Sequence, residues 1–193
     1  MIPRLRELYR RMDELYTSMA GEMGFSCLGC DGAACCTVDL VLHTLVERLY
    51  LKRGFNTLDS DSQERIKLRA AAMVREKDRD SRGESYRNLV CVLNEAGLCV
   101  LYQFRPMICR LAGISHSFLR PDGREIQGDG CVVFQRDVHP AHPSAHLDRT
   151  PLYVEMASIE AMALESLRRS RQRPCTVSEL FARILDSLPV VPE

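Results

Sequence analysis

Cysteine thiols are the side chains of this sequence whose number and spacing could do chemistry. The chain contains nine cysteines, and all but one of them lie between residues 27 and 131. Thiolate sulfur is a soft donor that binds zinc, cuprous copper and iron–sulfur clusters, usually with four ligands for each structural zinc or cluster. The cysteines of this stretch therefore fit two sets of four. The candidate metal ligands are Cys27, Cys30, Cys35, Cys36, Cys91, Cys99, Cys109 and Cys131.

The spacing of the first four candidates favours more than one metal ion. Cys27 and Cys30 are separated by two residues, a loop in which both sulfurs can reach one metal, and Gly29 between them permits a tight bend. Cys35 and Cys36 are adjacent, and neighbouring side chains of an extended segment point in opposite directions. They therefore suggest two metals or a polynuclear centre. The wider spacing of the later four matches neither a zinc ribbon nor a bacterial ferredoxin.

The segments CLGCDGAACC and CVLNEAGLCVLYQFRPMICRLAG, followed by a later lone cysteine, resemble the YkgJ-type cysteine-cluster family. Members of that family are described as zinc- or iron-chelating domains. The resemblance covers roughly residues 27 to 131 and carries the family pattern onto all of the candidate ligands. In the commonest spelling of the family three residues precede the double cysteine, whereas here there are four, Asp31 to Ala34. Other residues of the shared signature are Tyr102, Arg105, Pro106 and Arg110.

The resemblance implies metal binding without a settled reaction. A similar domain occurs in flagellin lysine N-methylases, where the cysteines are thought to bind an iron–sulfur centre. The implied cofactor is therefore zinc or iron, with an iron–sulfur cluster as one form of the latter. The sequence shows no G-x-G-x-x-G motif that opens a helix after a strand, so a conventional nucleotide or methyl-donor fold has no support. No residues are assigned as catalytic, and whether the protein is an enzyme stays open.

Three functions remain open at this point. The cysteines could hold zinc or iron as a metal-binding module, form the iron–sulfur centre of an enzyme or electron carrier, or serve metal delivery and storage. Buried thiols without a metal are an alternative, because free cysteine packs well in cores, and so is disulfide or redox chemistry. The clustering of the cysteines argues against both. Cys175 lies outside the resemblance and is interpreted as a bystander.

Composition narrows the class of partner. The 26 basic and 26 acidic residues give a formal net charge of zero, which favours neither a nucleic-acid groove nor an anionic membrane surface. The first residues, Met1 to Met19, alternate charged and apolar side chains and contain no unbroken apolar run, so they predict neither a secretory signal nor a membrane span. We therefore expect a cytoplasmic protein whose partner is a metal ion, with no nucleic acid and no membrane.

Histidines are weaker candidates than the cysteines. His139, His142 and His146 lie in the segment HPAHPSAH, where two prolines favour an extended polar loop over a helix face. His43 lies among apolar residues of an expected helix and is interpreted as packed rather than as a ligand.

Two arginines flank one of the candidate ligands. Arg105 and Arg110 lie on either side of Cys109, and an anionic thiolate site gains from cations that orient its ligands. We hypothesise that one of the two faces the site, the alternative being that both are surface charges.

The elements that must position these residues are mainly helical. The apolar spacing predicts an N-terminal helix over residues 3–20, helices from 39 to 51 and from 59 or 60 to about 80, and C-terminal helices within 150–188. Thr176 and Glu179 have the spacing of a capping box that opens the last helix.

Short hairpins complete the predicted fold. The runs 89–93 and 98–102 flank a turn at Gly97, and a second turn lies at Pro121–Gly123 ahead of Cys131. The sequence therefore predicts a small, mainly α, single domain over residues 1–193. Its metal-binding core spans about 25–135, with irregular cysteine-bearing loops and one or two short β-hairpins.

Overall fold

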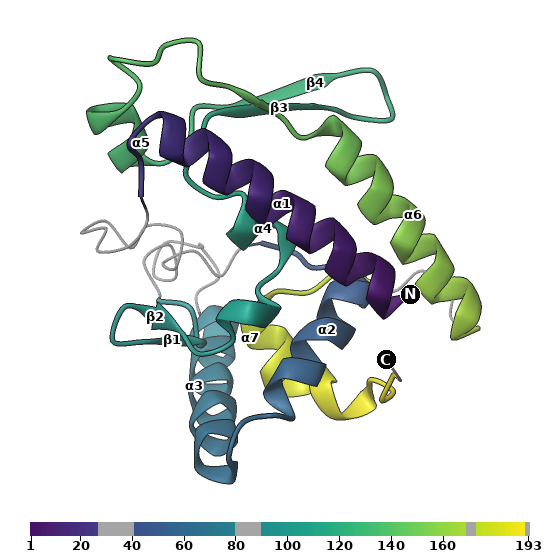
Figure 1. The fold of residues 1–193 in the computed structure, drawn as a ribbon. Helices are drawn as coiled ribbons and strands as arrows, with labels where there is room; N and C mark the ends of the chain where they lie inside the picture. Colours follow the sequence, from purple (N-terminus) through teal and green to yellow (C-terminus); the bar gives the residue numbers. More distant parts are fainter. Residues whose placement is uncertain (27–40, 80–89, 169–172, 192–193) are drawn as a thin grey trace. The chain divides into compact units, whose positions relative to one another are not determined.

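The computed structural model of the chain describes residues 1–26, 41–79, 90–168 and 173–191 (Figure 1). These residues fall into two compact units. Apart from Met1 and Ile2, the first unit is built from Pro3–Cys35 and Met107–Met162, and the second from Cys36–Pro106 and Ala163–Glu193. The single domain expected for residues 1–193 stays a prediction.

The first unit combines a long helix with a small sheet. Its elements are α1 (Ile2–Glu22), α4 (Met107–Arg110), β3 (His116–Leu119), β4 (Glu125–Gly128), α5 (Val132–Asp137), β5 (Leu147–Asp148) and most of α6 (Thr150–Ser166). The apolar stripe expected in α1 is confirmed: Leu5, Leu8 and Met12 are fully buried, although Leu15 is exposed. The predicted helix over 3–20 is thus confirmed and is slightly longer at both ends.

The second predicted hairpin belongs to a three-stranded sheet in the order β4-β3-β5. The antiparallel pair β3 and β4 is joined through Gly123, whose φ of +82° suits the turn that Pro121 and Asp122 predicted. The parallel pairing of β3 with β5 was not predicted. This pairing places the segment that follows His146 alongside β3, where the Leu147 amide donates to the Ser115 carbonyl at 2.9 Å.

A core of aromatic and aliphatic side chains joins the end of α1 to α5. The Phe25 and Phe134 rings pack edge to face with their centroids 5.5 Å apart. The cluster is made of Ala20, Phe25, Ile114, Phe134 and Val138, with Cys131 among the partly buried residues packed against it. One candidate ligand is therefore attached directly to the core of the first unit.

The second unit is a helical assembly with one hairpin. Its elements are α2 (Leu45–Phe55), α3 (Ser60–Arg79), β1 (Asn94–Glu95), β2 (Leu98–Cys99), η2 (Tyr102–Phe104), α7 (Val177–Glu179), η3 (Leu180–Ile184) and η4 (Leu185–Ser187). Apolar faces of α2 and α3 form its core, in which the Phe55 and Phe181 rings lie 5.1 Å apart. The capping box predicted at Thr176 is confirmed, since its side chain accepts from the Glu179 amide.

Helix α2 begins later than its apolar spacing predicted. Thr44 is the N-cap, because its hydroxyl accepts from the Glu47 amide while the Glu47 carboxylate accepts from the Thr44 amide. This capping box stops the helix from extending back to His43, whose amide instead donates to the Cys175 carbonyl at 2.9 Å. His43 is buried as expected but is not helical.

The predicted fold class is confirmed for the described residues, which are mainly helical and carry a two-stranded and a three-stranded sheet. None of the helices in this part of the chain has both the length and the apolar character that a membrane span needs.

Candidate metal centre

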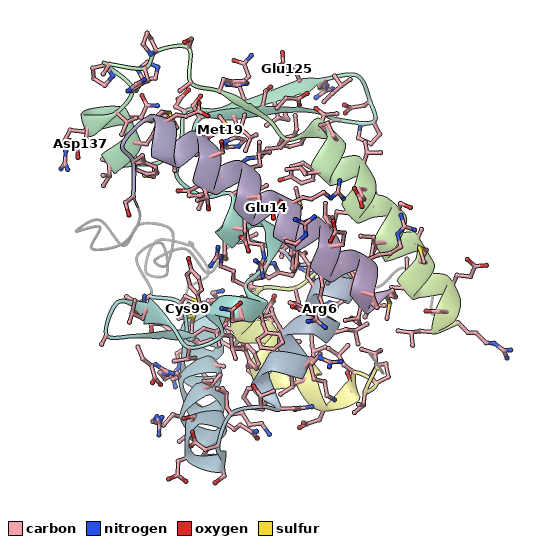
Figure 2. The ribbon with its side chains drawn as sticks, in the orientation of Figure 1. Arg6, Glu14, Met19, Cys99, Glu125 and Asp137 are labelled. Carbon is pink, nitrogen blue, oxygen red and sulfur yellow. The ribbon has the colours of Figure 1, made fainter. Side chains whose placement is uncertain are left out.

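Cys91 and Cys99 lie at the hairpin of the second unit. Ala96 and Gly97 connect its strands with φ values of +51° and +85°, the left-handed pair that a two-residue hairpin turn requires. Cys99 is on β2 and is the cross-strand partner of Asn94. Figure 2 labels Cys99 at this hairpin. Cys91 precedes the strand that was expected to carry it, and its carbonyl accepts from the Asn94 amide at 2.9 Å. Both cysteines are half-buried.

Helix α3 fixes this hairpin. The Arg69 guanidinium donates to the Asn94 carbonyl at 3.0 Å and to the Glu95 carboxylate at 2.8 Å. Arg65 adds a second ion pair to Glu95 at 3.6 Å. Asn94 is the cross-strand partner of Cys99. The contacts from α3 therefore hold the strand with which Cys99 pairs.

Cys109 lies on the single turn of α4 and is exposed. The next residue, Arg110, is buried, with 5% of its side chain accessible. Its guanidinium lies 4.2 Å from the centre of the Tyr9 ring and forms an ion pair with Asp13, so two residues of α1 hold it. Successive helical residues point about 100° apart. Burial of Arg110 therefore presents Cys109 to solvent.

The interpretation of both arginines as surface charges is wrong for Arg110. The hypothesis that one of them faces a metal site stays a prediction. Arg105 precedes Cys109 in the sequence, and its guanidinium lies 3.8 Å from the centre of the Tyr102 ring.

A second buried arginine, Arg149, also contacts this segment. It is 1% exposed, and its guanidinium donates to the Leu111 carbonyl at the end of α4. Burial lowers the pKa of Arg149 to about 10, although Tyr153 acts in the opposite direction. No sequence motif singles out this residue, which lies between β5 and α6. It supports the carbonyl end of the turn that carries Cys109.

Cys131 is the N-cap of α5. Its Sγ accepts a hydrogen bond from the Phe134 amide at 3.3 Å, so the sulfur takes the place of the usual capping oxygen. Its own amide donates to the Gly113 carbonyl at 2.8 Å. Two chain segments therefore cross here, one running on from Cys109 and the other bearing Cys131.

Two glycines allow the crossing to be this close. Gly130 has a φ of +85°, and a Cβ at this position would lie 2.4 Å from the Gly113 carbonyl oxygen. Gly113 has a φ of +105°, and a Cβ there would lie 2.9 Å from the Phe25 ring. Sequence reasoning missed both residues, although a glycine directly before a candidate ligand was visible at Gly130–Cys131. Only residues without a side chain fit these two positions.

The histidines expected in a polar loop are found there. His139 and His142 are half-buried, whereas His146 is exposed and its Nδ1 lies 3.2 Å from the Ser115 hydroxyl. Among the residues that the structure describes, no group of three or more histidine, cysteine, aspartate and glutamate side chains is arranged to hold a metal ion.

His116 on β3 differs from these loop histidines. Its ring lies over Gly128 of β4, where a Cβ would come within 2.5 Å of Cε1. Burial, and then the charge of Arg149, lower the pKa of His116 below its ordinary value.

A fall in pH should therefore destabilise the first unit through His116. The unfolded chain binds this proton more tightly than the folded chain does. The stabilising contribution is complete above the unfolded pKa of about 6.5 and is lost as pH falls through the lower folded pKa. Urea unfolding of the wild type and of His116→Gln at about pH 7.5 and pH 5.5 tests this. The variant should lose less stability on acidification; an equal loss would contradict the prediction.

The candidate ligands thus fall into three groups. Cys91 and Cys99 share the hairpin of the second unit, while Cys109 and Cys131 lie on crossing segments of the first. The predictions for the remaining four lie outside the described residues; these are Cys27, Cys30, Cys35 and Cys36. Comparisons with protein-family models, with curated proteins and with solved structures found no match.

Proposed function

We propose that this chain is a cytoplasmic metal-binding protein of the YkgJ type that holds zinc or iron through its clustered cysteine thiolates. Thiols stay reduced in the cytoplasm, which suits metal ligands better than disulfides. The proposed ligands are Cys27, Cys30, Cys35, Cys36, Cys91, Cys99, Cys109 and Cys131.

The observation that carries the proposal is the crossing at Gly113 and Cys131. The 2.8 Å hydrogen bond between their backbones ties the segment that follows Cys109 to a second proposed ligand. Phe25 packs against both Gly113 and Phe134 in the same core and precedes Cys27 by two residues in the sequence. The two described segments that carry Cys109 and Cys131 therefore meet at one cluster, to which Phe25 also belongs.

The side chains around the crossing fit an anionic centre. Thiolate ligands bring negative charge, which nearby cations and hydrogen-bond donors stabilise. The Phe134 amide already donates to the Cys131 sulfur. The buried Arg110 and Arg149 hold the turn that carries Cys109. These contacts hold the backbone that carries Cys109 and Cys131.

The test is the metal and acid-labile sulfide content of anaerobically purified protein, together with its visible spectrum. About two zinc ions per chain without sulfide would support two closed four-thiolate sites. Iron with matching sulfide would support the iron–sulfur form and redirect the search to redox chemistry. Protein that retains neither metal after reconstitution would contradict the proposal.

A pair of cysteine variants adds specificity to this test. We expect Cys131→Ser to lower metal affinity by about tenfold or more, because it removes a proposed ligand. Cys175→Ser is the matched control, since Cys175 is a buried cysteine outside the proposed set. It should retain the wild-type metal content. Competition with a chromogenic chelator measures both, and equal metal retention in the two variants would exclude Cys131 as a ligand.

A further inference from the structure

An open pocket lies in the first unit between the last turn of α1 and the loop that follows α5. It has a volume of about 310 Å³ and is lined by Met19, Glu22, Met23, His142, Ser144 and Ala145. Figure 2 shows Met19 toward the carboxyl end of α1. The proposed thiolate centre uses none of these residues, so the pocket needs a separate explanation.

Two thioethers and an imidazole face this pocket together. The Met23 amide donates to the Met19 carbonyl at 3.3 Å, which places the two side chains one helical turn apart on the same face of α1. His142 comes from the opposite wall, whereas Glu22, the last residue of α1, lines the pocket on the side of the methionines. Both methionines and His142 are half-buried, and all three line the open pocket.

Both walls are held in place by backbone contacts. The His142 amide donates to the carbonyls of Val138 and His139, at 3.1 and 3.2 Å. The Ala145 amide in turn donates to the His142 carbonyl at 3.0 Å. Met19, Met23 and Ala145 all pack against the core cluster around Phe134. The position of each donor is therefore set by the fold.

We propose that Met19, Met23 and His142 form a binding site for a cuprous ion, separate from the thiolate ligands. Thioether sulfur is a soft ligand that selects monovalent copper, and imidazole binds copper well. Hard divalent ions such as magnesium prefer oxygen ligands, and the pocket offers one carboxylate. Methionine also serves as a filler of irregular cores, but packing alone does not require an imidazole on the facing wall. The ion enters as Cu(I), and the site changes no oxidation state.

Silver(I), a redox-inert substitute for Cu(I), is the probe for this site. Protein labelled with ¹³C at its methionine methyl groups is titrated with silver past the capacity of its thiols. We expect the methyl signals of Met19 and Met23 to shift together, while the signal of the fully buried Met12 on the same helix stays in place. Signals of Met19 and Met23 that do not move, or that move no more than every other methionine signal, would overturn the proposal.

Variants link these shifts to the pocket. His142→Asn should weaken the silver affinity read from the Met19 and Met23 signals by about tenfold or more. Met162→Leu is the control, because Met162 is a half-buried methionine whose sulfur accepts from Arg4 at 2.8 Å. It should leave that affinity unchanged. Unchanged affinity in His142→Asn would overturn the site. The shifts are read only after the thiols are saturated with silver, because Cys131 packs against the same core cluster as Met19 and Met23. The thiolate proposal therefore stands or fails independently.

Discussion

Replacing Gly130 by alanine is expected to destabilise the protein by about 3 kcal/mol or more and to release metal from it. The new Cβ would lie 2.4 Å from the Gly113 carbonyl oxygen and 2.8 Å from the Phe134 ring. The φ of +85° adds a conformational penalty for any residue with a side chain. Relief of the clash requires the Cys131 segment to move away from Gly113. Urea unfolding and metal analysis of the purified variant measure the two effects.

Gly123→Ala is the control for Gly130→Ala. It adds a side chain at a positive φ without a steric clash, so it measures the conformational penalty alone. Gly123 has nearly the same φ, +82°, but no atom lies within 4 Å of the Cβ that alanine would add. This variant should cost about 1 kcal/mol and should keep its metal. If the two variants lost equal stability, or if Gly130→Ala retained metal as the wild type does, the crossing would not be what positions Cys131.

Elements with strong local signals were predictable from the sequence. Periodic apolar residues identified α1 and α6. The start of α3 was expected at residue 59 or 60, and the structure has Asp59 in the capping role, since its carboxylate accepts from the Ser62 amide. The turn at Gly97 identified the first hairpin. In each case the deciding interactions join residues close in sequence, so a short window contains the information.

The predictions were wrong where contacts between residues distant in the sequence determine the structure. The apolar residues ahead of Thr44 continue the helical pattern, but His43 pairs with Cys175, far along the chain. Helix α2 was expected to end at about residue 51 but continues to Phe55, with Gly54 packed against the Phe104 ring. The parallel pairing of β3 with the short β5 has no local signal at all.

The candidate metal site also has features that the sequence predicts and features that only long-range contacts determine. Residue type and spacing were sufficient to nominate the cysteines, because thiolate chemistry belongs to the residue itself. The contacts that hold the backbone near these cysteines were not predictable. Burial of Arg110 and Arg149 depends on α1 and on the Leu111 carbonyl, and the close crossing depends on two glycines that are distant in sequence. Such contacts exist only after the chain has folded.

Asp13→Ala is expected to destabilise the protein by about 2 kcal/mol and to speed the loss of metal to a chelator. The substitution removes the carboxylate that pairs with Arg110, a guanidinium with 5% of its side chain accessible. The cost should stay below that of a fully buried pair, because 38% of the Asp13 side chain is accessible and Arg110 keeps its contact with the Tyr9 ring. A looser Arg110 lets the turn bearing Cys109 move. Urea unfolding and chelator competition measure the two effects.

A double variant distinguishes a buried charge from simple loss of packing. Arg110→Met keeps an apolar stem of similar length, and replacing both partners of a buried pair by apolar groups is often close to neutral. Asp13→Ala with Arg110→Met should therefore be more stable than Asp13→Ala alone. Arg10→Met on the exposed face of α1 is the control; it breaks the pair with Glu7 at 2.6 Å and should change stability little, because solvent screens that pair. A double variant no more stable than Asp13→Ala would mean that the charge of Arg110 is not what Asp13 compensates.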